Sequence, residues 1–256
     1  MLRKRLITVL TFNQGVLFRT KLFTPDYRYT LNFVDAWSID EIVVLDVTRD
    51  PANGGESFRQ VIADFASRCF VPLAAGGGIR TLDDVRSYLD LGADKVVINS
   101  GAIERPSLIT EIANRFGSQC AVLSIDAKKT SVDTAGGSPG ASYEVYSHFG
   151  ARPTGLDPSD WAKQGQELGA GEILIGSIDR DGSLQGYELP LCREVSDAVG
   201  IPVLVSGGAG NWDHFVQGFT EGGASGVCTA NIYHFTESSI QSAKRHLDNA
   251  GIPVRI

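Results

Sequence analysis

The chain has 256 residues, of which 43% are hydrophobic and 21% charged, as is typical of a globular protein with a substantial core. Its net charge of -7 argues against a general nucleic-acid binder, which needs clustered lysine and arginine to displace counterions from phosphates. The N-terminal apolar run is too short for a secretion signal and no run reaches the roughly 18 residues of a membrane span, so we expect a cytoplasmic protein with no membrane partner.

Short runs of apolar, largely β-branched residues recur along the chain, and their near-continuous apolarity predicts strands covered on both faces. The predicted strands are 6–11, 42–47, 71–75, 95–99, 121–126, 172–177, 201–206 and 226–230. Helical patterns lie between them, at 81–92, 106–117, 157–169 and 238–251 among others. Eight strand–helix repeats favour a closed α/β barrel, the (β/α)8 or TIM barrel, over an open doubly wound sheet.

The two halves of the chain resemble one another. DEIVVLDVTRD (40–50) is similar to GEILIGSIDRD (171–181), and VPLAAGGGI (71–79) is similar to IPVLVSGGA (201–209). We therefore predict one domain, 1–256, built from half-barrels at about 1–119 and 120–256. The segment at about 130–155 is too long for an ordinary loop, and its alternating YEVYSHF predicts a hairpin-like insertion over one barrel end.

Glycine-rich turns follow two of the predicted strands, where barrel enzymes place their active sites. They contain Gly77 and Gly78 in one half and Gly207 and Gly208 in the other. Glycine lets backbone amides approach an anion closely, so the duplication predicts two phosphate sites and a bisphosphorylated small-molecule substrate. The alternative is that these glycines only relieve crowding in tight turns. No metal or organic cofactor is expected, because the four histidines show no ligand spacing.

Several motifs resemble the cyclase subunit of imidazole glycerol phosphate synthase, and the similarity runs nearly end to end. These motifs are GADKVVIN (92–99), FGSQ (116–119), SIDAK (124–128), GAGEIL (169–174), SIDRDG (177–182) and SGGAG (206–210). The resemblance implies a barrel that receives ammonia from a glutaminase subunit and uses it on a bisphosphorylated nucleotide precursor.

The resemblance also implies two catalytic aspartates, one after each of the strands 6–11 and 121–126. Asp126 matches the second, although a strand-end carboxylate can also simply cap a turn. Thr11 stands in place of the first, and a hydroxyl cannot act as a carboxylate base near neutral pH. Asp46, Asp179 and Asp181 are candidate substitutes, with ligand positioning or loop structure as their alternative roles.

The phosphate-binding and substrate-binding set combines the glycine turns with residues matched by the resemblance. Arg19 belongs to it and stands where a lysine is usual. The full set is Arg19, Gly77, Gly78, Asn99, Ser100, Gly101, Asp179, Asp181, Gly182, Gly207, Gly208, Ala230 and Asn231.

Four charged residues, Arg5, Glu41, Lys95 and Glu172, precede or begin predicted strands. Two cations and two anions can form a mutually neutralising ring, whereas exposed strand-edge charges are the alternative. The resemblance implies a charged gate at the floor of an ammonia channel. It also implies a glutaminase-facing surface at the N-terminal barrel face, which includes Asp94, Phe116 and Gln119.

Three functions follow from this pattern. The segments KLFTPDYRY and RCFVP, together with Thr11, resemble paralogues that supply ammonia for acetamidino-sugar and surface-polysaccharide synthesis, with a separate sugar amidotransferase as a further partner. We favour that function over an authentic cyclase subunit of histidine biosynthesis. A third hypothesis is a non-catalytic ammonia conduit that activates the glutaminase, for which Asp126 has no use.

Overall fold

Eight parallel strands form a closed barrel in the computed structural model, which describes residues 3–14, 16–21, 24–26, 38–49, 55–130, 142–230 and 237–255. The strands are β1 (Arg5–Asn13), β4 (Glu41–Asp46), β5 (Leu73–Gly76), β6 (Lys95–Ile98), β7 (Ala121–Thr130), β10 (Glu172–Ser177), β11 (Val203–Ser206) and β12 (Gly226–Thr229). Neighbours in this order pair in parallel, including β7 with β10, and the pairing of β12 with β1 closes the barrel. The predicted (β/α)8 barrel is therefore confirmed.

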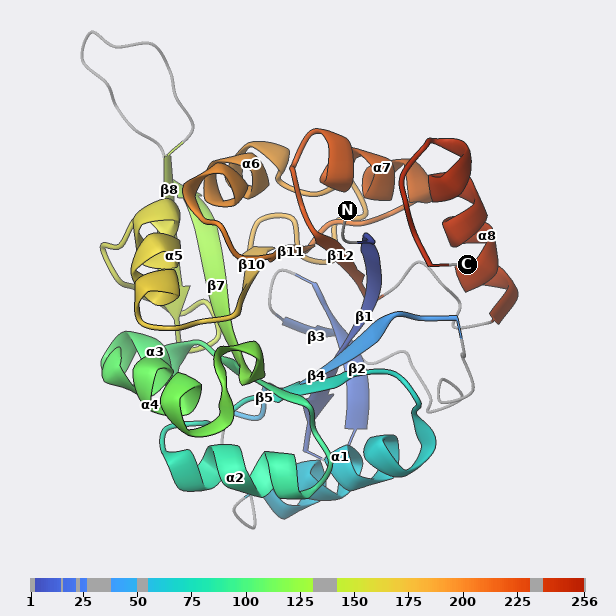
Figure 1. Cartoon of the computed structure of the whole chain (residues 1–256). Coiled ribbons are helices and arrows are strands. Elements are labelled where there is room, and N and C mark those ends of the chain that lie inside the picture. Colours follow the sequence, from blue (N-terminus) through green and yellow to red (C-terminus); the bar gives the residue numbers. More distant parts are fainter. Residues whose placement is uncertain are drawn as a thin grey trace, which may run out of the picture.

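Helices surround the barrel on its outside (Figure 1). They are α1 (Glu56–Arg68), α2 (Leu82–Asp90), α3 (Ser100–Glu104), α4 (Ser107–Phe116), α5 (Pro158–Glu167), α6 (Leu189–Ala198), α7 (Trp212–Thr220) and α8 (Glu237–Asn249), with a short 3-10 helix at Ser118–Cys120. Side-chain caps fix several starts, as where Thr81 accepts from the Asp84 amide. Within the described ranges, no helix has the length and apolar character needed to cross a membrane.

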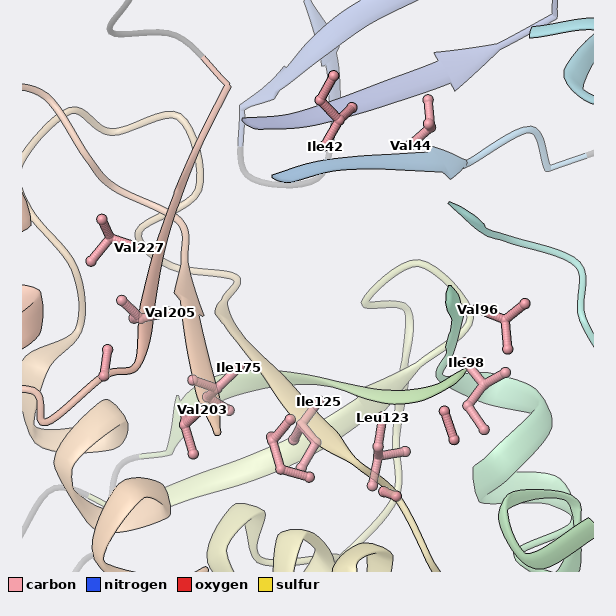
Figure 2. Close-up of a cluster of buried hydrophobic side chains, with 14 of the residues drawn as sticks. Ile42, Val44, Val96, Ile98, Leu123, Ile125, Ile175, Val203, Val205 and Val227 are labelled. Carbon is pink, nitrogen blue, oxygen red and sulfur yellow. The ribbon is translucent and has the colours of Figure 1, made fainter. Parts of the chain in front are cut away.

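The strands bury both of their faces, which explains their continuous apolarity. Leu6 and Leu10 of β1 face outward into the layer between strands and helices, while Ile7 and Val9 face the barrel interior. Figure 2 shows the outer layer, to which strands from β4 to β12 contribute side chains such as Ile42. Strand alternation therefore determines which residues reach the interior and, at the strand ends, the functional site.

Two antiparallel hairpins extend from the carboxyl ends of barrel strands. The first comprises β2 (Val16–Lys21) and β3 (Thr24–Asp26) and follows β1; the sequence patterns do not predict it. The second pairs the end of β7 with β8 (Ser142–Ser147), which then pairs with β9 (Arg152–Pro153). It lies within the segment predicted as an insertion, of which residues 131–141 fall outside the described residues. Both hairpins leave the barrel at the end where a barrel active site is expected.

Candidate active site

A closed ring of charges lies at the N-terminal end of the barrel. Each member comes two residues before an inward-facing apolar residue of its strand, so the alternation of a strand turns it into the interior. Arg5 contacts Glu41 at 2.7 Å and Glu172 at 2.8 Å. Lys95 contacts the same two glutamates at 2.9 Å each. The four side chains therefore form a ring in place of four exposed strand-edge charges.

Burial makes the pairing in this ring energetically important. The Glu41 side chain is 2% exposed and that of Lys95 is 15% exposed. Burial by itself lowers the pKa of Arg5, but Glu172 and Glu41 together raise it above the usual value. The ring is thus electrically compensated, and removal of one member leaves a buried charge without its counterion.

An apolar layer lies directly above the ring in the barrel interior. It consists of Ile7, Val9, Val43, Ala74, Val97, Val122, Leu174, Leu204 and Cys228. Burial raises the pKa of Cys228, so its thiol is neutral and behaves as a small apolar group. The middle of the barrel therefore offers no charged side chain from this layer.

A pocket of about 580 Å³ opens above this layer, at the carboxyl ends of the strands. It extends down to Val9, Val97 and Leu174, which belong to the apolar layer. Its volume suits a small-molecule ligand. The pocket brings together many of the predicted site residues: Thr11, Gly77, Gly78, Asn99, Ser100, Gly101, Asp126, Asp181 and Gly207.

Other predicted substrate-binding residues do not line this pocket within the described part of the chain: Asp179, Gly182, Gly208 and Ala230. Asp179 instead accepts a hydrogen bond from the Lys129 amide at 2.9 Å, which ties its loop to β7. The carbonyl of Gly208 accepts from the Gly186 amide at 2.7 Å. Arg19 lies in β2, and Asn231 lies outside the described residues.

The two glycine turns have matching backbone conformations. The φ angles are +108° and +68° at Gly77 and Gly78, and +89° and +104° at Gly207 and Gly208. A side chain is strained in this region of φ. Tyr88 of α2 fixes the first turn by donating its hydroxyl to the Gly77 carbonyl at 2.8 Å. The backbone of both turns therefore reaches the pocket wall in a form that only glycine adopts easily.

Gly77→Ala is expected to destabilise the protein by about 2 kcal/mol, because it adds a close contact to an unfavourable φ. The new Cβ would lie 2.3 Å from the Asp46 carbonyl oxygen. Gly78→Ala is the matched control, since no atom lies within 4 Å of its added Cβ. The control should lose only about 1 kcal/mol in urea denaturation. Equal losses in the two variants would contradict the close contact.

Asp126 lies at the inner wall of the pocket, on β7. Asn99 donates its side-chain amide to Asp126 Oδ2 at 2.8 Å. Asp126 Oδ1 lies over Gly176, where an added Cβ would approach it to 3.2 Å. Burial first, and the charge of Asp181 second, raise the pKa of Asp126 to about 7. A carboxyl group with this pKa can both donate and accept a proton near neutral pH.

Thr11 occupies the pocket wall on β1. The residue is almost fully buried, at 9% exposed, and it pairs in register with Leu45 of β4. Asp46 ends β4 beside Phe12, and its Oδ1 accepts from the Thr48 amide at 2.9 Å. The pocket wall at Thr11 thus carries a hydroxyl group in place of a carboxylate. The Asp46 carboxylate caps the turn that follows β4.

Four residues that line the pocket were not predicted from the sequence. They are Arg49, Arg80, His148 and Phe149. His148 and Phe149 have positive φ angles of 52° and 60°. The His148 amide donates to Ser100 Oγ at 2.9 Å. The turn between β8 and β9 therefore lies against the start of α3 at the pocket. Such strained conformations at non-glycine residues often mark functional positions.

The N-terminal face contains the residues predicted to contact a partner. Asp94 Oδ2 accepts from the Leu73 amide at 2.8 Å, and the Gln119 side chain donates to the Phe116 carbonyl at 3.3 Å. Asp94 and Gln119 are both exposed. Phe70, in the turn before β5, is 80% exposed, whereas Phe116 packs partly against the core. Both hydrogen bonds are local contacts within the chain. The contact with a partner therefore stays a prediction.

The architecture and the pocket agree with a comparison with known protein families. Residues 8–239 match the family described as "Histidine biosynthesis protein". The match covers all eight barrel strands except the first three residues of β1. The chain therefore belongs to the histidine biosynthesis protein family and is a barrel enzyme of that family.

Proposed function

We propose that this enzyme receives ammonia from a glutaminase subunit at its N-terminal face and uses it on a phosphorylated substrate in the pocket at its C-terminal face. The observation that carries the proposal is the stacking of ring, apolar layer and pocket inside one barrel. Small neutral ammonia suits an apolar passage, whereas ammonium is costly to desolvate.

The charged ring supports an entrance at the floor of the barrel. Its four contacts, from 2.7 to 2.9 Å, close the interior toward the N-terminal face. Ammonia enters when the ring opens, and the Arg5 guanidinium and Lys95 ammonium then remain paired with one glutamate each. Asp94, Gln119 and the exposed Phe70 lie on the same face, where the glutaminase subunit would dock.

Asp126 favours chemistry in the barrel over a passive conduit. A conduit needs no group that titrates near neutral pH, yet Asp126 has a pKa of about 7 and lines the pocket. The glycine turns on opposite halves supply backbone amides for phosphate groups. Arg49 and Arg80 on the rim add positive charge for an anionic substrate.

Thr11 favours an acceptor other than the histidine-pathway precursor. The resemblance to the cyclase subunit implies a carboxylate at that position, and this chain has a buried hydroxyl there. We therefore propose a paralogous role in acetamidino-sugar or surface-polysaccharide synthesis, in which a separate sugar amidotransferase completes the transfer. An authentic cyclase of histidine biosynthesis is the second candidate, favoured by the retained Asp126.

Partnership is tested by adding the intact protein to the glutaminase subunit of the same organism and measuring glutamine hydrolysis. We expect stimulation of at least about tenfold, because docking assembles the glutaminase site. Asp126→Asn should leave this stimulation intact, since the substitution lies at the opposite end of the barrel. Absence of stimulation by the wild-type protein would refute the partnership.

Thr11→Asp is expected to raise turnover of the bisphosphorylated nucleotide precursor about 100-fold in an assay with ammonium salt and no glutaminase. The new carboxylate would supply the acid–base group that the resemblance implies at the end of β1. The control combines Thr11→Asp with Asp126→Asn and should lose the gain. If the wild-type protein forms imidazole glycerol phosphate rapidly, it is an authentic cyclase.

A further inference from the structure

Three carboxylates near the pocket could compensate for Thr11, and their positions relative to Asp126 distinguish them. Asp46 Oδ1 accepts from the Thr48 amide at 2.9 Å and holds the turn after β4. Asp179 Oδ2 accepts from the Lys129 amide at 2.9 Å and holds the loop after β10 against β7. Asp46 and Asp181 both line the pocket with Asp126, but only Asp181 follows β10, the strand that pairs with β7 beside Asp126. Asp181 is therefore the strongest candidate for a second proton-handling group.

The pairing of β7 with β10 brings Asp181 toward Asp126. Asp126 pairs in register with Gly176, next to the end of β10, and the loop carrying Asp181 begins directly after Ser177. The Asp181 amide donates to the Ser177 carbonyl at 3.0 Å, which folds the loop back over the strand end. The negative charge of Asp181 contributes to the raised pKa of Asp126. The two carboxylates thus interact across one wall of the pocket.

Hydrogen bonds to the buried Glu188 hold the loop that carries Asp181. Arg180 donates its Nε to Glu188 Oε2 at 3.0 Å, and Tyr143 donates its hydroxyl to Glu188 Oε1 at 2.8 Å. Glu188 is 8% exposed. Arg180 is therefore paired with a carboxylate that does not line the pocket, while its neighbour Asp181 does.

Three neighbouring strands also contribute residues around Asp126. Asn99 donates to it from β6, Tyr146 of β8 lies opposite it in register, and β10 presents Gly176. The other charged or titratable groups that line the pocket in the described part of the chain are Asp46, Arg49, Arg80 and His148.

We propose that Asp126 and Asp181 form a carboxylate couple that shares one proton and performs the acid–base work of the pocket in place of a carboxylate on β1. Two nearby carboxylates resist simultaneous ionisation, so a single proton is held between them near neutral pH. The identity of the reaction rests on the proposed function, whereas the couple itself does not.

The couple suits the addition of ammonia to an electrophilic carbon. As the new N–C bond forms, the ionised carboxylate takes the surplus proton from nitrogen. The protonated carboxyl gives its proton to the substrate oxygen that receives the displaced electron pair. The couple ends with one proton, as it began, so no other acid or base is consumed.

Carboxyl-carbon NMR titration of the intact protein tests the couple without any substrate. Asp126 is expected to titrate near pH 7 in the wild type and at least about one pH unit lower in Asp181→Asn, where the like charge is gone. Glu144→Gln is the control: it removes a carboxylate from β8, the strand paired with the end of β7, and should leave the Asp126 midpoint in place. An unchanged midpoint in Asp181→Asn overturns the proposal.

The reciprocal variant guards against a folding defect in Asp181→Asn. In Asp126→Asn, the Asp181 resonance should lose any inflection near pH 7, because coupled groups report each other's titration. Persistence of that inflection in Asp126→Asn also overturns the proposal.

Turnover of the bisphosphorylated nucleotide precursor with ammonium salt tests the catalytic role. Asp181→Asn should lower the residual wild-type kcat at least about tenfold and change its pH profile. In the Thr11→Asp background the same substitution should have less than about a threefold effect, because the new carboxylate takes over. A structural or substrate-binding role for Asp181 predicts equal losses in both backgrounds, which would overturn the catalytic assignment. If neither background turns over this substrate, the authentic-cyclase alternative fails and the NMR result alone decides the couple.

Discussion

Lys95→Ala is expected to lower the free energy of unfolding by about 3 kcal/mol at neutral pH, because it leaves a buried carboxylate without its counterion. Lys95 is shared between Glu41 and Glu172, at 2.9 Å from each. After the substitution, Arg5 alone faces two buried negative charges. Urea denaturation of the intact protein measures the loss.

Two further variants test the cause of this loss. One separates the effect of the lost charge from that of lost packing, and the other compares a buried ion pair with an exposed one. Lys95→Met keeps most of the aliphatic stem and should lose nearly as much stability as Lys95→Ala, since the missing charge is the cause. Lys163→Ala breaks an exposed pair with Asp160, whose side chains are 50% and 75% exposed, and is expected to change stability by less than about 0.5 kcal/mol. A similarly small loss in Lys95→Ala would contradict the buried ring.

The ring is poorly explained by stability alone. Well-packed apolar side chains in place of a buried ion-pair network are often neutral or stabilising. The interior immediately above the ring is already apolar, so apolar side chains in place of the ring would pack against it. A function that needs a polar closure which can open accounts better for the ring, and this argument supports the proposed ammonia entrance.

The sequence predicted the barrel strands well because both faces of each strand are buried. The run 172–177 has six buried residues in β10, and β1 has seven buried residues between its half-buried ends. Continuous burial produces a continuous apolar pattern that short local windows detect. Residues such as Glu41 and Glu172 interrupt that pattern at the strand starts, which made them visible as candidates.

The sequence could not predict contacts that depend on loop geometry. The amide of His148 reaches Ser100, 48 positions away, only because the hairpin folds back across the mouth. The influence of Asp181 on Asp126 likewise requires the pairing of β7 with β10 and the return of the following loop. The hairpin of β2 and β3 was also missed, since KLFTPDYRY has no strict alternation of apolar and polar residues.

Asp126→Asn is expected to be more stable than the wild type above pH 7, and its advantage should grow by about 3 kcal/mol between pH 4.5 and pH 8. The amide cannot ionise, but its oxygen can still accept the hydrogen bond that Asn99 donates to Asp126. The comparison therefore isolates the cost of a charge at this site.

The sign follows from proton binding. The pKa of Asp126 is raised to about 7 in the folded protein, whereas an aspartate in the unfolded chain titrates near about 4. Between these values the folded state holds a proton that the unfolded state has lost, so wild-type stability falls as pH rises and then becomes constant above pH 7. The variant lacks this term, and the difference between the two proteins is complete once Asp126 has ionised.

Urea denaturation at four or five pH values from 4.5 to 8 measures the difference, with exposed Asp248→Asn as the control for loss of one negative charge. The control should stay within about 0.5 kcal/mol of the wild type throughout. Parallel stability curves for Asp126→Asn and the wild type would mean that Asp126 ionises without cost and is unsuited to general acid catalysis near neutral pH. Curves that separate up to pH 7 and then run parallel would show that the folded pocket retains a proton on Asp126 at the expense of its own stability, as an acid–base group requires.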